Sequence, residues 1–507
     1  MKKTLKISPF NRAEGDLEIK VGLEDGKVTE AYASGVMFRG FERLLKGRDP
    51  MDALVFTPRI CGICSASHST ACSNALRVAF KAKMPPNAYL ARNIILATEV
   101  LLNHLTHFYL FFVVDLVNKK YLPSRDHREL AKRFAPFEGS SYSKFIRART
   151  NLLGVLGLFA GKWPNTLALQ PGGTTRPVNL SEIIRAKGIL VEFQNFLEQD
   201  FLGSEIERWL ENKNLPDIDF WMGENSHKNS DLGIFIKSAP QFGLDKIGKG
   251  PGKFLSSGGY ELADGTTWLK SGYFDGEFKS FNEGKITEDI KHSWLKGYEK
   301  GRHPFEGVTE PDVDKPGAYS WAKSPRYNGN VVEVGPLARM INDRDPLVLN
   351  LVSDLGPSVY TRVLARLHEG VRLLKQLKIW LEEIDPSQPF YIKPEKPKQA
   401  MGKGLIEAAR GVLGHWIIIE KDKIKNYQVI TPTTWNVSPR DSHGNPGAVE
   451  EALIGTSVED EKNPVEIAHI IRSYDPCLFC TVHALKMNKP IATFELAVQG
   501  IIKRGYL

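Results

Sequence analysis

Two cysteine pairs contain the side chains best suited to bind a metal ion, and they use four of the chain's five cysteines. Both have the spacing Cys-x-x-Cys, and each is followed by a histidine; the residues are Cys61, Cys64 and His68, then Cys477, Cys480 and His483. Asp475 and Pro476 precede the second pair, a combination typical of a capped helix start. This predicts that both of its cysteines lie in a first helical turn, where free N–H groups and the helix dipole favour thiolates.

More than 400 residues separate the two pairs, so they can share one metal centre only if both ends of the chain meet in the interior. Four thiolates suit structural zinc, an iron–sulfur cluster, or a soft redox metal such as nickel. Structural zinc sites usually take their cysteines from a short segment. We therefore favour a buried redox or catalytic metal, with structural zinc and unligated thiols as the alternatives.

The composition is that of a soluble globular protein. The 507 residues allow about three domain-sized units or one large core. Hydrophobic residues make up 42% and charged residues 25%, which are ordinary values. The net charge of +8 is mild for this length, and Lys and Arg form no dense block, so a nucleic-acid partner is not expected.

Cysteine usage favours a reducing compartment, because five unevenly spaced cysteines do not suit a secreted disulfide scaffold. The first 20 residues lack the apolar core of a signal peptide. The most apolar stretch, 100–114, is shorter than a membrane span and contains Asn103, His104 and His107, for which we expect a core polar network. We predict a cytoplasmic protein that reaches a membrane only through a partner.

Hydrophobic periodicity predicts a helix-rich α+β fold. Long helices are expected over 87–115, 180–210 and 358–384, and short ones over 447–453 and 464–474. Strands 17–23 and 28–33 form one predicted hairpin, and strands 414–420 and 426–430 form another. Between 221 and 338 the periodicity weakens, which indicates short strands and loops. No phosphate-binding glycine motif is present.

Six sequence blocks, in order and nearly end to end, resemble the large subunit of the nickel–iron hydrogenases. They are Arg12-x-Glu14-Gly15, Arg39-Gly40-x-Glu42, Arg59-Ile-Cys61-Gly-Ile-Cys64 with His68, Glu407-Ala-Ala-Arg410-Gly411 with His415, Pro432-Thr-Thr-Trp435-Asn436, and Asp475-Pro-Cys477-x-x-Cys480-x-x-His483. A related subunit of complex I lacks the four cysteines and is disfavoured. The resemblance implies one large fold with a central bundle of long helices and small peripheral β-sheets.

The resemblance also implies the metals. Cys61 and Cys477 would bind nickel terminally, and Cys64 and Cys480 would bridge nickel to an iron that carries carbon monoxide and two cyanides. A magnesium ion would be bound by Glu42, His483 and the backbone carbonyl of Val429. On composition alone, Glu14 and Glu42 would be surface carboxylates, so their placement tests the resemblance.

The activity implied is heterolytic cleavage of H2. The Cys477 thiolate is the favoured base, ahead of the Arg410 guanidinium, because arginine is a poor base. Glu14 would relay the proton outward. Arg410 and Thr433 would donate hydrogen bonds to the cyanides, and Asp475 would pair with Arg410. His68 and Asn103 would stand beside the ligands.

The chain departs from the family pattern at three positions. Asn103 stands where many relatives have Asp, Ala409 where they have Pro, and Asn165 where they often have His. Ala409 would loosen the backbone beside Arg410. Ile63 and Phe111 match the narrow point of the family's gas channel, and bulky residues there resemble oxygen-resistant sensory members. Ordinary core packing is the alternative for both.

The resemblance divides the chain into a mature part, 1–483, and an extension, 484–507, that a maturation endopeptidase would remove. The alternative is an ordinary C-terminal strand and helix. Only Cys72, expected to be a plain buried thiol, remains beyond the four ligands, so electrons would need an iron–sulfur small subunit as partner. We predict an H2-uptake enzyme, with a hydrogen sensor and a non-catalytic scaffold as alternatives.

Overall fold

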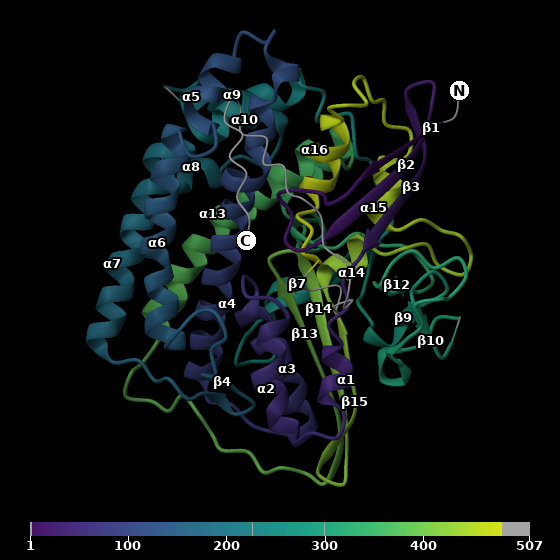
Figure 1. Cartoon of the computed structure of the whole chain (residues 1–507). Coiled ribbons are helices and arrows are strands. Elements are labelled where there is room, and N and C mark those ends of the chain that lie inside the picture. The colour runs from purple at the N-terminus through teal and green to yellow at the C-terminus, as the bar shows by residue number, and fades with distance from the viewer. Residues whose placement is uncertain (1–2, 226, 299, 479–507) are drawn as a thin grey trace, which may run out of the picture.

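Four long helices form the core of the computed structural model, which describes residues 3–225, 227–298 and 300–478. Figure 1 shows them together on one side of the molecule, and they are α4 (Pro86–Thr106), α6 (Ser140–Ala160), α7 (Leu180–Phe196) and α13 (Val359–Glu383). Helix α4 packs on α13 and α6, and α6 packs on α7. Helix α13 begins with a capping box at Ser358, close to the predicted start.

Helix α4 continues beyond its regular part as the π-helix η3 (His107–Phe112) and the 3-10 helix η4 (Val113–Val117). Among the described residues, the stretch Pro86–Val117 alone is long and apolar enough to cross a membrane. Of its most apolar window, 72% is buried within the protein. The predicted core polar network is present, because His104 contacts Arg366 and Glu369, and His107 bonds to the carbonyl of Arg472.

Small antiparallel sheets lie beside the helices. The three-stranded sheets, each with its strands in chain order, are β1 (Lys3–Ile7), β2 (Leu17–Glu24) and β3 (Lys27–Gly35); β6 (Phe254–Glu261), β7 (Thr267–Phe274) and β8 (Phe278–Lys279); and β13 (Gln399–Ala408), β14 (Gly411–Glu420) and β15 (Lys423–Ile430). The two-stranded sheets are β4 (Leu169–Gln170) with β5 (Gly173–Thr174), β9 (Ile286–Asp289) with β12 (Ser324–Tyr327), and β10 (Leu295–Lys296) with β11 (Glu310–Pro311).

Shorter helices connect these parts. They are α1 (Phe41–Leu45), α2 (Ala53–Phe56), α3 (Ser65–Phe80), α5 (His127–Phe134), α8 (Ile206–Leu210), α9 (Leu215–Gly223), α10 (Asp231–Gln241), α11 (Pro336–Asn342), α12 (Pro346–Leu355), α14 (Pro432–Asn436), α15 (Ala448–Leu453) and α16 (Val465–Ser473). Short 3-10 or π turns are η1 (Pro50–Asp52), η2 (Thr57–Ile60), η5 (Lys119–Tyr121), η6 (Leu197–Leu202), η7 (His227–Asn229), η8 (Glu283–Lys285) and η9 (Pro304–Glu306).

Helix α3 lies directly on the backbone of strand β13. A Cβ at Gly404 would stand 2.0 Å from the carbonyl oxygen of Ala71, and a Cβ at Gly402 would stand 2.0 Å from that of Ala75. Only glycine permits such an approach. Because α3 starts just after Cys64, this contact fixes the first cysteine pair against the sheet formed by β13, β14 and β15.

The α+β, helix-rich prediction is confirmed, as are both hairpins and the two short C-terminal helices. Helices α3 and α6 were not predicted, and three further details differ. The helix predicted over 180–210 passes into η6 and breaks at Gly203, whose φ of +71° ends it. Helix α10 lies inside the region predicted to be strands and loops, although Ser230 caps it. Strand β13 was not predicted, because its apolar residues do not alternate regularly.

Candidate metal centre

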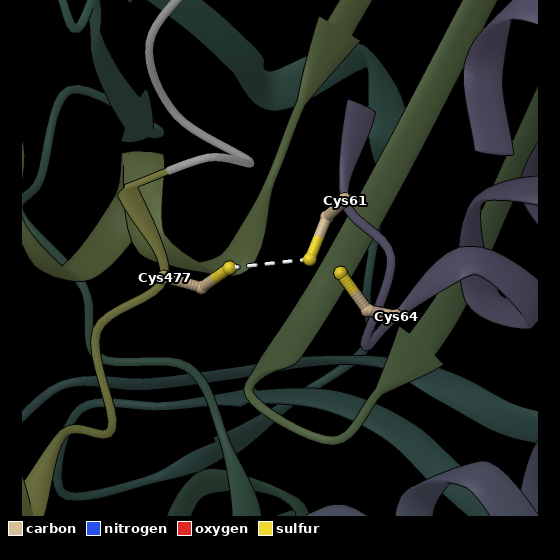
Figure 2. Close-up of side chains that lie close together, drawn as sticks. All are labelled: Cys61, Cys64 and Cys477. Atoms are coloured by element: carbon tan, nitrogen blue, oxygen red, sulfur yellow. Dashed lines mark hydrogen bonds between the residues drawn. The ribbon is translucent and has the colours of Figure 1, made fainter. Parts of the chain in front are cut away.

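Three of the four predicted cysteine ligands meet in the interior. The Sγ atoms of Cys61, Cys64 and Cys477 lie within 4.8 Å of one another, and all three residues are buried. The sulfurs of Cys61 and Cys477 are 3.4 Å apart (Figure 2). Cys480, the fourth predicted ligand, lies outside the described residues. The two ends of the chain therefore do converge.

A helix begins at Leu478, two residues later than predicted, so Cys477 lies immediately before its first turn and not inside it. Asp475 has a φ of +53° instead of the extended backbone of a helix cap. The turn places Cys477 in an isolated parallel bridge with Glu14, and its backbone N–H donates to Thr433 Oγ1 at 2.9 Å. Contacts with the N-terminal segment and with Thr433 thus position Cys477 at the residue that precedes the helix.

The other pair sits at the start of helix α3. Cys64 is the N-cap residue of this helix and makes no side-chain cap hydrogen bond. The side chain of Glu99 instead accepts hydrogen bonds from N–H groups of the first turn. Its two oxygens accept hydrogen bonds of 2.8 Å from the backbone of Ala66 and Ser67. Trp163 Nε1 donates to the same carboxylate at 2.8 Å. Glu99 was missed from the sequence, although it precedes Asn103 by one helical turn on α4.

Arg410 occupies the tight turn between β13 and β14. Its Nη2 forms an ion pair of 3.0 Å with Asp475 Oδ1, and its Nε donates to the Asp475 carbonyl at 2.7 Å. Nη1 donates to Asn103 Oδ1 at 3.3 Å, and Asn103 in turn donates to the carbonyl of Ile63 at 2.9 Å. Burial alone would lower the pKa of Arg410, but Asp475 and the cysteines, led by Cys477, raise it well above its usual range. Arg410 is therefore a fixed cation.

The turn that carries Arg410 is held by two more buried arginines. Arg339 and Arg366 donate to the carbonyl of Ala409 at 3.2 and 3.5 Å, and Arg366 also pairs with Asp475 at 3.1 Å. These contacts fix the backbone at Ala409, where the resemblance led us to expect a looser chain. The loosening expected at Ala409 is thus offset. Neither arginine was singled out from the sequence.

Glu14 is half-buried and lies beside residues 476–478. Its backbone N–H donates to the Pro476 carbonyl at 3.3 Å, and its own carbonyl accepts from Leu478 N at 2.5 Å. Burial and then the charge of Cys477 raise the pKa of its carboxyl group above the usual value. Glu14 is thus not the exposed surface carboxylate that composition alone would predict.

The segment around Glu14 is tied to the core by a second buried ion network. Asp115 pairs with both Arg12 and Arg472, and Arg472 also donates to Asn11. Burial would raise the pKa of Asp115, but the two arginines lower it below the usual value. The network joins η4, α16 and the N-terminal loop, and it was not foreseen.

His68 and Cys72 lie on successive turns of α3. His68 Nδ1 is 3.1 Å from His415 Nε2, while its Nε2 has no hydrogen-bond partner among the described residues. Cys72 is buried as expected, and burial raises the pKa of its thiol to about 11. Asn165, the remaining departure, donates its backbone N–H to Ser65 at 3.2 Å.

The predicted magnesium ligands are only partly described, since His483 lies outside the described residues. Glu42 is buried, and its Oε1 accepts from the N–H of Val429 at 2.8 Å. Its Oε2 lies 3.4 Å from Lys323 Nζ, which is also 3.5 Å from the buried carboxylate of Glu288. Glu288 Oε1 has no partner among the described residues. Two carboxylates thus share this ammonium, and burial raises the pKa of Glu288 to about 7.

The two gas-channel candidates are placed differently. Ile63 is partly buried and packs against the cysteine cluster. Phe111 lies in η3, where its carbonyl accepts from Arg12 at 3.0 Å. Their role in a channel stays a prediction.

The donor set suits nickel. Thiolates are soft ligands that favour nickel, copper and zinc over hard ions such as magnesium. The three sulfurs are buried, and they are near enough to Arg410 that their charges would stabilise its cation. Soft donors shielded from water suit a redox metal, and the described residues fit one.

Comparison with known proteins assigns the family. The model of the nickel-dependent hydrogenases matches residues 39–145 and 137–483. The periplasmic [NiFeSe] hydrogenase large subunit of Desulfomicrobium baculatum is 34% identical over 96% of this chain and 95% of its own length. The Hydrogenase-2 large chain of Escherichia coli K12 is 30% identical over 96% of this chain and 98% of its own.

Solved structures agree. The [NiFeSe] hydrogenase structure of Dm. baculatum superimposes with a TM-score of 0.82 at 32% identity, covering 95% of this chain and 100% of that one. The enzyme of D. vulgaris Hildenborough gives 0.81 at 33% identity, with 95% and 100% covered. The matches include a relative named as an uptake hydrogenase large subunit, from Rhodobacter capsulatus, at 30% identity over 97% of each chain.

The converging cysteines, the buried Arg410 and the matches over nearly the whole chain all indicate the same family. The chain belongs to the nickel-dependent hydrogenase family, as a large subunit of an enzyme that oxidises H2.

Proposed function

We propose that Cys61, Cys64, Cys477 and Cys480 hold a nickel–iron centre at which H2 is split heterolytically and reversibly. Cys61 and Cys477 would be terminal nickel ligands, and Cys64 and Cys480 would bridge the two metals. When bound, the centre with its carbon monoxide and two cyanides supplies the redox chemistry. The observation that carries the proposal is the approach of three buried sulfurs within 4.8 Å from opposite ends of the chain.

The chain's own residues would move the proton. Arg410 is held as a cation by Asp475, so it orients the site and does not accept a proton. The Cys477 thiolate is then the better base. Glu14 pairs with the backbone of Cys477, and its raised pKa suits a carboxyl group that takes up and releases protons.

The hydroxyl of Thr433 accepts from the Cys477 N–H, which leaves its own hydrogen for an iron-bound cyanide. Arg410 would donate to the second cyanide. These two donors would anchor the iron ligands without a protein–metal bond. Asn103, bonded to both Arg410 and Ile63, would hold the arginine over the first cysteine pair.

Electrons would leave through an iron–sulfur small subunit in a heterodimer, because Cys72 is the sole cysteine beyond the four ligands and it is buried away from solvent. We propose that residues 484–507 are removed by a maturation endopeptidase after metal loading, and that Glu42, Val429 and His483 bind magnesium. Mass spectrometry of the active enzyme tests the first, and magnesium analysis of a Glu42→Gln variant tests the second.

A hydrogen sensor is the second candidate function. It is favoured by the bulky Ile63 beside the cysteine cluster, together with Phe111, as in slow, oxygen-resistant members. Turnover of the purified heterodimer distinguishes the two, because a sensor would turn over slowly and keep residues 484–507 uncleaved. We further propose a cytoplasmic location, based on cysteine usage, which cell fractionation tests.

Elemental analysis and infrared spectroscopy of the purified complex test the main proposal. We expect nickel and iron with bands in the cyanide and carbonyl region. Cys61→Ser, Cys64→Ser and Cys477→Ser should each lose nickel, whereas Cys72→Ser should keep it. A wild-type complex without nickel, or without those bands, would exclude the proposed chemistry.

A further inference from the structure

A cavity of about 200 Å³ lies between helices α3 and α4 and strands β6 and β13. The two helices pack against each other (Figure 1). No cysteine lines the cavity, so it is separate from the metal centre. Its polar lining includes residues of α3, α4 and β6, namely Thr70, Asn74, Tyr89, Arg92, Asn93 and Glu261. Of the described residues that line it, only Arg92 and Glu261 are charged at neutral pH.

Arg92 is a buried cation, with 4% of its surface exposed. Its Nη1 donates to Met84 Sδ at 2.9 Å and to the Gln170 carbonyl at 3.4 Å. Its Nη2 donates to Ser73 Oγ and to Asn74 Oδ1, both at 2.6 Å. Within the described part of the chain, all its acceptors are neutral and its Nε makes no hydrogen bond. Buried charges in proteins are normally paired with an opposite charge, and this one is not.

The carboxylate of Glu261 is already paired with a different arginine. Both of its oxygens accept from Arg77 Nη2, at 2.8 and 2.5 Å. Burial and then the charge of Arg77 lower the pKa of Arg92 to about 10, and Glu261 opposes this less strongly than Arg77 promotes it. Arg92 is therefore still a cation at neutral pH. Two arginines stand against one glutamate here, so the cavity keeps one positive charge without a counter-charge.

Two neighbouring side chains hold unused hydrogen-bond donors. Asn74 uses its amide oxygen to accept from Arg92, while its Nδ2 donates to no described residue. The hydroxyl of Tyr89 accepts from Arg77 Nη1 at 3.4 Å, and its own hydrogen has no acceptor in the described part of the chain. With Arg92 Nε–H, three side chains around one cavity therefore offer a free donor. Donors that surround an uncompensated positive charge are the features of an anion site.

Charge and size together define the class of anion. One uncompensated positive charge matches a monovalent anion, whereas a dianion would leave an excess negative charge in a buried site. Both Nη atoms of Arg92 are already engaged, so its guanidinium offers a single N–H and cannot bind an oxyanion through two parallel hydrogen bonds. Water takes about 30 Å³ per molecule, so the cavity has room for a small anion with some water around it.

We propose that this cavity binds one small monovalent anion, chloride or a short carboxylate such as acetate, through Arg92 Nε–H with Asn74 and Tyr89 as further donors. The anion neutralises Arg92 and joins helix α3 to helix α4. Because α3 begins just after Cys64, the anion also steadies the helix that follows the first cysteine pair. The proposal uses none of the metal ligands, so it does not depend on the proposed function.

Bromide locates the site directly, because it replaces chloride and scatters X-rays anomalously. In crystals of the purified complex grown with sodium bromide, we expect an anomalous peak within hydrogen-bonding distance of Arg92 Nε. A cavity that holds only water overturns the proposal, as does a carboxylate of a partner subunit against Arg92. A peak that no response in solution accompanies is an adventitious ion only, and it overturns the proposal too.

Thermal unfolding of the full 507-residue chain measures binding in solution. An anion that binds only the folded state raises the unfolding midpoint as its concentration increases. We expect the midpoint to rise when sodium chloride or sodium acetate replaces the sodium salt of a bulky anion, HEPES, at constant ionic strength. A midpoint that stays level with both salts overturns the proposal. The measurement needs no nickel, so its result is separate from that of the proposed function.

Variants assign the response to the cavity. Arg92→Gln should lose the rise, and Tyr89→Phe, which removes one donor, should weaken anion binding by about tenfold. Arg149→Gln is the matched control, because Arg149 on α6 also pairs with no described carboxylate, donates to Thr106 at 3.1 Å and lies outside the cavity. It should keep the wild-type rise. A full rise in Arg92→Gln overturns the proposal. If Arg92→Gln does not fold, the Tyr89→Phe titration and the bromide crystals still decide.

Discussion

Asp475 and Arg410 are joined twice, once through side chains and once through the backbone. The carboxylate lies 3.0 Å from the guanidinium Nη2, and the carbonyl accepts from Nε at 2.7 Å. Both residues are buried. The pair therefore connects residues 475–478 to the β13–β14 turn, close to the three cysteines.

Asp475→Ala should destabilise the protein strongly. It leaves Arg410 and Arg366 as buried cations without this carboxylate, and removing one partner of a buried pair costs about 3–5 kcal/mol. Urea unfolding of the metal-free chain measures the loss. Glu420→Gln, which breaks an exposed pair with Lys425, is the control and should cost less than about 1 kcal/mol. Equal losses would show that the buried pair does not stabilise this segment.

Gly404→Ala should displace helix α3. Its Cβ would meet the Ala71 carbonyl oxygen at 2.0 Å, and overpacking of this kind costs about 1–3 kcal/mol. Because α3 follows Cys64, nickel content should fall as well. Gly157→Ala, in helix α6 with open space around it, should instead stabilise by about 0.5–1 kcal/mol. Full nickel content in Gly404→Ala would show that metal binding does not depend on this helix contact.

Glu14→Gln should abolish most turnover while keeping the metals. General acid–base groups contribute about 100-fold or more to rate, and glutamine does not relay a proton. Hydrogen-oxidation assays measure the loss, and the infrared bands show that the centre is intact. Glu24→Gln, at the exposed last residue of β2, should retain wild-type activity. Wild-type turnover in Glu14→Gln would assign the relay to another group.

Glu450 should make stability depend on pH. Burial raises the pKa of its carboxyl group from 4.5 to about 7 in the folded protein. The folded state then binds this proton more tightly than the unfolded state, so the contribution of Glu450 to stability falls as pH rises from 4.5 to about 7 and is level above that.

Glu450→Gln removes this titration. Its unfolding free energy should therefore rise relative to the wild type across the same pH range, measured by urea unfolding at each pH. Glu211→Gln, at an exposed site, should follow the wild type in parallel. A constant difference between Glu450→Gln and the wild type would refute the assignment.

Much of the architecture was predictable from periodicity and local signals. Helix α13 and the β14–β15 hairpin follow from strong patterns with clear caps and turns. The convergence of Cys61 and Cys477 was predicted from ligand chemistry, because four thiolates suit one shared metal centre, and it is confirmed. The Asp475–Arg410 pair came from the family resemblance alone.

The missed features depend on tertiary contacts. The turn at Asp475 overrides a good helix-cap sequence, because Cys477 gains a bridge to Glu14, more than 400 residues away. Glu99 and Tyr427 have ordinary local sequences, and their partners lie on other elements. Polar residues of this kind are usually exposed, so the sequence alone does not predict their burial. They are buried here because residues on other elements form hydrogen bonds with them.

The distance along the chain between the half-sites has a consequence for synthesis. At about 5–20 residues per second, a ribosome needs on the order of 20–80 s to pass from the codon of Cys64 to that of Cys477. Throughout that time the nascent polypeptide exposes two thiols without their counterparts. The set of four thiols is therefore complete only near the end of synthesis.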